Sequence, residues 1–153
     1  MAIRRERIVT VTMNEMMGSS LGKPVAYADR YDPGLLFAIP RAPNRAALGL
    51  AADAALPFHG IDIWNAYEVS WLDARGKPVI ALAEFRIPAS SPCLIESKSF
   101  KLYLNSFNQE RMQGVDALRA CLMRDLRAAS GAEVAVALTS PRQFAQQGLT
   151  ELE

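Results

Sequence analysis

The segment AYEVSWLDARGKPVIALAEFRI, residues 66–87, decides the fold, because it holds two alternating apolar runs on either side of a short turn. In the first run, Tyr67, Val69 and Trp71 fall on one face of an extended chain. The intervening DARGK has the glycine and the charged residues of a tight turn, and the second run continues through Ile87. The segment therefore predicts an antiparallel β-hairpin.

Beyond the hairpin the apolar period changes from two residues to that of a helix. The first helical stripe consists of Phe100, Tyr103, Leu104 and Phe107. The second stripe predicts a helix from about Val115 to Ala129 that stops at Gly131, and it consists of Val115, Leu118, Leu122 and Leu126. AEVAVAL, residues 132–138, then returns to a strand pattern. The chain thus reads strand, strand, helix, helix, strand.

This order predicts an α+β fold, with an antiparallel sheet and two helices on one face. We assign the fold to residues 61–140. Residues 20–60 are expected to form an irregular arm, because proline and glycine recur every few residues there. Residues 1–19 are expected to be a disordered leader, and residues 141–153 the start of a linker. The open sheet edges are expected to pair with another module or subunit.

Composition narrows the classes of function. The chain has 153 residues, of which 17 are Lys or Arg and 16 are Asp or Glu, so its net charge is +1. This balance gives no support to a dominant attraction to nucleic acid or to an anionic membrane. No apolar run is long enough for a membrane span, and the first residues lack a convincing signal peptide.

The titratable residues that most often carry chemistry are few. Cys93 and Cys121 lack the spacing of zinc ligands, and His59 is the single histidine, so a zinc site would lack ligands. We expect a reducing, cytoplasmic setting with both thiols free. His59 is interpreted as a turn or packing residue, and Cys121 as a small core residue beside the second stripe.

Glu96 to Ser99, with the sequence ESKS, stand at the start of the first predicted helix. Two interpretations remain open from the residues alone. In the first, Ser97 is a helix N-cap and the lysines are solvated. In the second, the helix start and its hydroxyl and ammonium groups bind an anion, while Glu96 accepts N–H groups from a planar heterocycle.

ESKSFKLY, residues 96–103, closely resembles the signature of the NADPH-dependent 7-cyano-7-deazaguanine reductases, the QueF nitrile reductases of queuosine biosynthesis, a tRNA modification pathway. The resemblance extends over about residues 20–140, through LPFHGIDIW, YEVSWLDARGKP, LNSFNQERM and YDPGLLFAIPRAPNRAALGL. It implies the tunnelling fold (T-fold), in which modules assemble by their sheet edges. The chain resembles the first module of the two-module branch of this family.

The resemblance also implies a mechanism and site residues. A cysteine thiolate adds to the nitrile of 7-cyano-7-deazaguanine, an aspartate supplies protons, and two NADPH molecules deliver hydride. By this likeness Ile95, Glu96 and Ser97 contact the deazapurine, with Glu96 reading its N–H edge, and Ser97 and Lys98 contact NADPH.

No catalytic residue is assigned to this chain. In the two-module branch the cysteine and the aspartate belong to the second module. In the single-module branch the nucleophile precedes the motif glutamate by about forty residues, where this chain reads GLAADAALPFHG and has no cysteine. The chain alone is therefore expected to be inactive, and to act with a second T-fold module or subunit in a homo-oligomer. We expect no direct nucleic-acid or membrane partner.

Two functions remain as alternatives to the nitrile-reductase module. In the first, the chain is a non-catalytic T-fold module that keeps the motif for binding or assembly. In the second, it is part of another T-fold enzyme that acts on purines or pterins. The SKSFKLY continuation argues against the second alternative.

Overall fold

A three-stranded antiparallel sheet forms one layer of the protein, as the computed structural model shows for residues 30–51 and 55–146. Its strands are β2 (Ile61–Leu72), β3 (Pro78–Pro88) and β5 (Ala135–Thr139), in the order β2-β3-β5. The predicted hairpin and the predicted last strand are both confirmed. The predicted leader, residues 1–19, lies outside the described residues.

The phase predicted for the first strand is wrong at Tyr67, because a β-bulge interrupts β2. Ala66 pairs with Ala83, but the next pair along β2 joins Val69 to Ala81, so the register shifts between them. The bulge changes which side chains face the core. Val69 and Trp71 are both buried, whereas the Tyr67 side chain is 81% exposed, so Tyr67 does not share their face as predicted.

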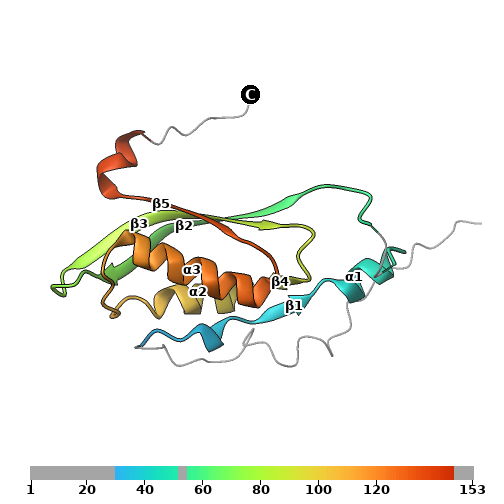
Figure 1. The fold of residues 1–153 in the computed structure, drawn as a ribbon, viewed down its shortest axis with the longest axis horizontal. Coiled ribbons are helices and arrows are strands. Elements are labelled where there is room, and N and C mark those ends of the chain that lie inside the picture. The colour runs from blue at the N-terminus through green and yellow to red at the C-terminus, as the bar shows by residue number, and fades with distance from the viewer. Residues whose placement is uncertain (1–29, 52–54, 147–153) are drawn as a thin grey trace, which may run out of the picture.

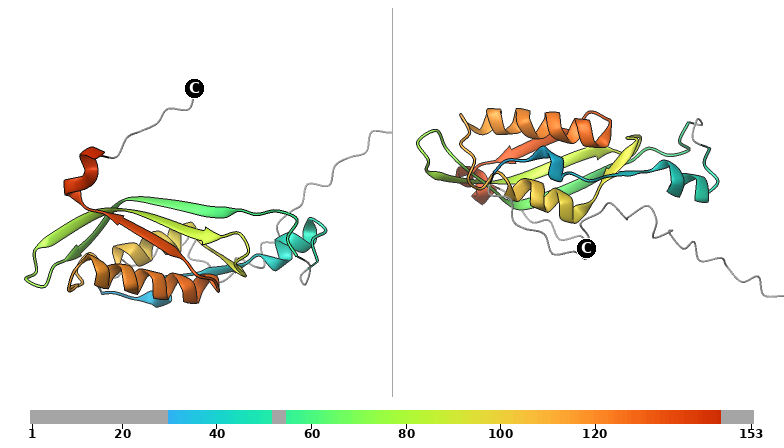
Figure 2. Two further views of the ribbon diagram at one scale, coloured as in Figure 1. Left: turned by 45° about the horizontal axis from the view of Figure 1, so that its top comes forward. Right: turned by 90° about the horizontal axis from the view of Figure 1, so that it is seen from below.

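Two helices cover one face of this sheet, as predicted (Figure 1; Figure 2, left). They are α2 (Ser97–Asn105) and α3 (Val115–Ser130). The core between the layers is made of the inward residues of β3 and of the two helical stripes, chiefly Phe85, Ile87, Phe100, Tyr103, Phe107, Leu118, Leu122 and Leu126. Val115 does not belong to it, because this first residue of α3 is 38% exposed.

The predicted irregular arm contains short ordered elements, and one of them is a strand. The 3-10 helix η2 (Pro33–Leu35) is followed by β1 (Ala38–Pro40) and by α1 (Ala42–Ala47). β1 pairs antiparallel with β4 (Cys93–Ile95) in a second, two-stranded sheet. No residue pattern predicted this pairing, which brings the arm to Ile95, the residue just before Glu96.

The described chain ends with the 3-10 helix η3 (Pro141–Gln146), inside the predicted linker. The fold is therefore α+β with antiparallel sheets, as expected. Within the described ranges, no helix has the length and apolar character needed to cross a membrane.

Candidate functional site

Glu96 is the N-cap of α2 and closes the first turn with its own side chain. Its backbone is extended, with φ −69° and ψ 134°. Oε1 accepts the N–H of Lys98 at 2.8 Å, and Oε2 accepts the N–H of Ser99 at 2.7 Å. The interpretation of Ser97 as the N-cap is therefore wrong. Ser97 is already the first helical residue, and the carboxylate of Glu96 satisfies two amides that a helix start leaves unpaired.

This capping changes the anion-site interpretation of the same residues. The amides of Lys98 and Ser99 are already bonded to a carboxylate, so they are not open to a phosphate in this conformation. A carboxylate has acceptor capacity for more than one hydrogen bond on each oxygen, so Glu96 can still accept donors from a ligand. The arrangement therefore suits a site that accepts hydrogen bonds from N–H groups of a ligand better than a site that binds phosphate.

The arm fixes Glu96 from the other side. Its amide donates to the carbonyl of Phe37 at 2.9 Å. The Phe37 amide in turn donates to the Ser99 hydroxyl at 3.0 Å, and that hydroxyl donates to the Glu96 carbonyl at 2.7 Å. Phe37, Glu96 and Ser99 thus form a closed set of hydrogen bonds around the helix start.

The four site residues predicted from the sequence lie together but differ in exposure. Ile95 ends β4 with its side chain in the core, 3% exposed, and Glu96 is 5% exposed. Ser97 is exposed, and Lys98 is half-buried on the first turn of α2. A ligand at this site therefore meets Ser97 first, and reaches Glu96 only at a small exposed part of its surface.

A groove of about 450 Å³ lies between β2 and α2, and Ser97 is part of its wall. Lys101 and Asn105 follow Ser97 along the same wall at helical spacing of four residues. The volume is within the range of small-molecule sites in proteins. Ile95, Glu96 and Lys98 do not line this groove.

The floor and opposite wall of the groove come from aromatic residues and from the bulge of β2. The Trp64 and Phe100 rings meet edge to face with centroids 5.6 Å apart, and Phe85 lies beside Phe100. Tyr67 and Glu68, the bulged residues, also line the groove. The site therefore combines an apolar floor with hydroxyl, ammonium, amide and carboxylate groups. No pattern in the sequence indicated this groove.

Neither cysteine lies at the groove. Cys93 is the first residue of β4. Cys121 is on α3, where its thiol lies 3.2 Å from a guanidinium nitrogen of Arg124 and 3.6 Å from Oδ2 of Asp125. Burial raises the pKa of the Cys121 thiol, which disfavours the nucleophilic thiolate. Cys121 packs against the core, as its sequence position suggested, and its thiol also contacts the polar groups of Arg124 and Asp125.

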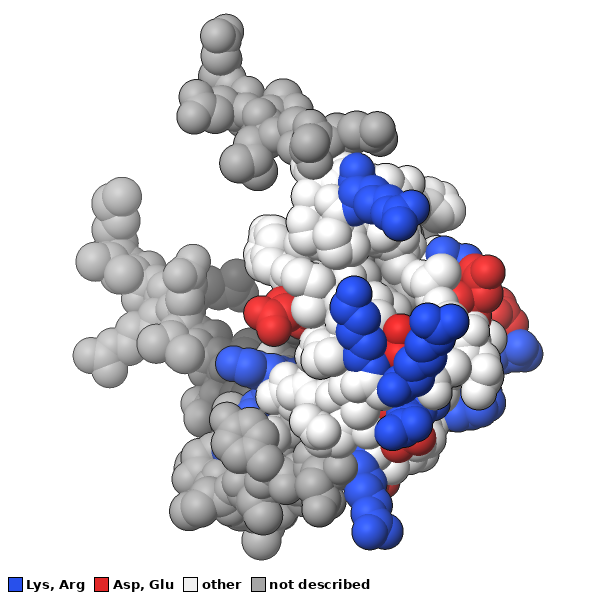
Figure 3. Space-filling model, turned by 90° about the vertical axis from the view of Figure 1, so that its left-hand side faces the viewer, with Lys and Arg blue, Asp and Glu red and all other residues white. Residues whose placement is uncertain are grey.

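Charges of both signs share the surface at the end of the molecule that lies on the left of Figure 1. Figure 3 shows Lys and Arg side chains there separated by Asp, Glu and uncharged residues.

His59 is exposed and lines a different cavity from the groove, beside Pro88 and Ser90.

Comparisons with known proteins agree on one family. The family model described as "Nitrile reductase, 7-cyano-7-deazaguanine-reductase N-term" matches residues 27–138. A protein of Chromobacterium violaceum named NADPH-dependent 7-cyano-7-deazaguanine reductase is 62% identical over 134 residues, which cover 88% of this chain and 48% of that protein. Proteins of the same name from Bordetella pertussis and Burkholderia vietnamiensis are 59% and 58% identical, over 90% and 88% of this chain and over 50% and 48% of their own lengths. The chain spans about half the length of these curated relatives.

Proposed function

The chain belongs to the 7-cyano-7-deazaguanine (nitrile) reductase family, and from this premise we propose that it is the N-terminal ligand-binding module of such an enzyme. The enzyme would reduce the nitrile of 7-cyano-7-deazaguanine to the aminomethyl group of 7-aminomethyl-7-deazaguanine, in queuosine biosynthesis. The observation that carries the proposal is the buried Glu96 carboxylate, held by two backbone amides next to a groove.

Glu96 is proposed to read the N–H edge of the deazapurine. Its carboxylate cannot turn freely, because each oxygen is held by one backbone amide. A pre-oriented acceptor loses little conformational entropy when a ligand binds, and hydrogen bonds to an ionised acceptor are the strong ones. Ile95 and Ser97 flank Glu96 and are proposed to complete the substrate contacts, as the family likeness implies.

Ser97 and Lys98 are proposed to contact NADPH, which supplies hydride when it is bound. Ser97 is suited to this role because its exposed side lines the groove. Lys101, one turn further along α2, adds an ammonium group to the same wall. A hydroxyl and a cation beside an aromatic floor fit a ligand that has both polar groups and a planar ring.

The nucleophilic cysteine and the proton-donating aspartate are proposed to come from a second T-fold module. Neither Cys93 nor Cys121 lines the groove, and the pKa of Cys121 is raised. β2 and β5 are the edges of the three-stranded sheet, and exposed edges are suited to strand pairing. The groove adjoins the β2 edge, so a module paired there would lie next to Ser97 and Lys101.

Calorimetry on a protein that carries both modules tests this function. 7-cyano-7-deazaguanine should bind the unmodified protein, and Glu96→Gln should weaken binding at least about tenfold, because it removes the charge of the acceptor. Glu133→Gln is the matched control, because Glu133 is 72% exposed, pairs with Arg127 near the C-terminal end of α3, and does not line the groove. Equal affinity in the Glu96→Gln and Glu133→Gln variants would disprove the role of Glu96.

A further inference from the structure

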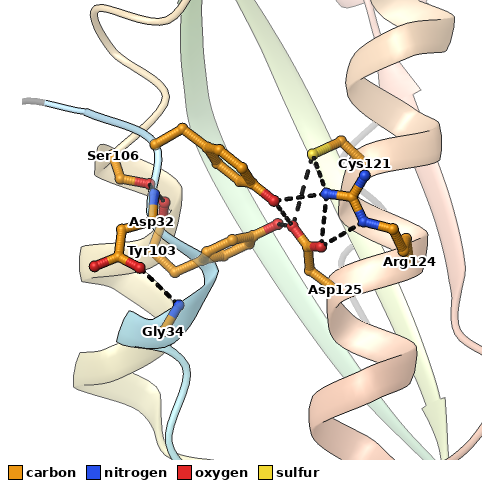
Figure 4. Close-up of polar contacts among 8 residues, drawn as sticks. Asp32, Gly34, Tyr103, Ser106, Cys121, Arg124 and Asp125 are labelled. Atoms are coloured by element: carbon orange, nitrogen blue, oxygen red, sulfur yellow. Dashed lines mark hydrogen bonds and ion pairs between the residues drawn. The ribbon is translucent and has the colours of Figure 1, made fainter.

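Asp125 is a buried carboxylate for which the proposed chemistry has no use. It lies on α3, is 6% exposed, and points toward α2 and the arm (Figure 4). Its Oδ2 accepts the hydroxyl of Tyr103 at 2.7 Å and the hydroxyl of Tyr31 at 2.6 Å. Its Oδ1 accepts Nε of Arg124 at 2.9 Å. A buried charge is tolerated only when it is paired and hydrogen-bonded, so these contacts depend on one another.

The two tyrosines that bond Asp125 belong to different parts of the fold. Tyr103 is on α2, the helix that Glu96 begins, whereas Tyr31 precedes η2 in the arm. Burial is the main cause that raises the pKa of both hydroxyls, and the hydrogen bond to Asp125 adds to it. Both groups therefore remain protonated donors well above neutral pH.

Residues 31–41, which we name the strap, run between α2 and α3 on the side away from the sheet (Figure 2, right). Near its start, the amide of Asp32 donates to the Ser106 hydroxyl at 3.3 Å, after the end of α2. Further along, Phe37 bonds both Ser99 and Glu96 at the start of α2. The strap thus spans α2 from its end to its beginning.

We propose that Tyr31 and Asp125 are positioning residues for Glu96, because their hydrogen bond holds the strap that orients the start of α2. The functional part of this inference rests on the proposed function, since it makes ligand affinity depend on the contact. Neither residue needs to touch the ligand. The contact acts through Phe37, whose carbonyl and amide are both bonded to the site.

A series of contacts along the strap links Tyr31 to Glu96. The Tyr31 ring packs on Phe107 with centroids 4.9 Å apart, so the ring would still attach the strap to the core if the hydroxyl were removed. The hydroxyl adds a bond to a charged, buried acceptor, and such bonds are stronger than bonds between neutral groups. Loss of that bond should let the strap open locally without unfolding the core.

Tyr31→Phe is the sharpest test, because it removes the hydroxyl and keeps the ring. Hydrogen exchange measured by NMR on the 153-residue chain should become roughly tenfold faster at the amides of Phe37 and Glu96. The amide of Phe85, in the core strand β3, should exchange at an unchanged rate. Asp125→Asn should give the same local pattern, and Asp116→Asn, at an exposed acid on the same helix, should not.

Unchanged exchange at Phe37 and Glu96 in Tyr31→Phe would overturn the inference. Equal acceleration at Phe85 would also overturn it, because it would mean a general loss of stability. Affinity for 7-cyano-7-deazaguanine, measured on the two-module protein, should fall in Tyr31→Phe and stay unchanged in Asp116→Asn. If the unmodified protein did not bind this compound, the proposed function would fail, while the exchange rates would still decide the positioning role.

Discussion

Glu96 and Ser99 are joined by two hydrogen bonds, each 2.7 Å long. The amide of Ser99 donates to Oε2 of Glu96, and the hydroxyl of Ser99 donates to the Glu96 carbonyl. The same hydroxyl accepts the amide of Phe37. One serine therefore connects the carboxylate, the helix backbone and the strap, so helix capping and the geometry of the proposed site depend on the same contacts.

Glu96→Ala should lower the free energy of unfolding by about 1 kcal/mol, because it removes the side chain that caps α2. The chain should remain folded, since its apolar core is untouched. Denaturant unfolding followed by circular dichroism measures the change, with Glu133→Ala as the exposed control. If both variants were as stable as the unmodified chain, the capping bonds would not contribute in solution.

The bulge in β2 predicts a large loss of stability for one aromatic substitution and a small one for another, although a regular strand would place both side chains on the same face. Trp71→Ala should cost about 3–5 kcal/mol, because Trp71 is 4% exposed. Tyr67→Ala should change stability by less than about 0.5 kcal/mol, because Tyr67 is 81% exposed. Urea midpoints of the two variants distinguish the bulged strand from a regular one, in which both substitutions would be costly.

Gly131→Ala should destabilise the chain more than Gly49→Ala. Both glycines have positive φ, of 76° and 80°, so alanine at either position carries a backbone cost of about 1–2 kcal/mol. A Cβ at Gly131 would also lie 2.9 Å from Cγ of Pro92, whereas a Cβ at Gly49 meets nothing within 4 Å. Thermal unfolding of the two variants gives the comparison, and equal losses would contradict the close contact with Pro92.

The Cys121 thiol should react slowly with iodoacetamide at pH 8 in the folded chain. Its pKa is raised by burial, so less thiolate is present at this pH than in the unfolded chain. The unfolded chain loses this thiol proton at a lower pH than the folded chain does. The contribution of Cys121 to the free energy of unfolding is therefore present at neutral pH and is lost as the pH rises through the raised pKa. Mass spectrometry of the alkylated peptides, with and without urea, measures the rate ratio. Faster reaction in the folded chain would contradict the raised pKa.

The bulge could have been found in the sequence. Trp64 and Trp71 are seven residues apart, an odd number, so a regular strand would place them on opposite faces. In the structure both face the helices, since Trp64 contacts Phe100 and Trp71 is buried in the core. Two apolar series out of phase within one strand are therefore a signal of an inserted residue.

The strap and the groove had no comparable signal. β1 has three residues, and its partner β4 lies more than fifty residues further along the chain, so neither strand shows a period long enough to recognise. The capping role of Glu96 was missed for another reason. Ser, Thr, Asp and Asn are the usual caps, and only the extended backbone at Glu96 shows that its longer side chain folds back.

The sequence by itself determined the hairpin, the two helices, the last strand and the family, because these depend on local periodicity and on one contiguous motif. Only the tertiary structure decided how the carboxylate and the backbone of Glu96 are oriented. Its carboxylate is oriented by the first turn of α2. Its backbone is oriented by the strap, through Phe37, which is far from Glu96 in the sequence, and the strap is bonded to Asp125 through Tyr31. Contacts between distant segments depend on how the layers pack, and no local pattern of residues encodes them.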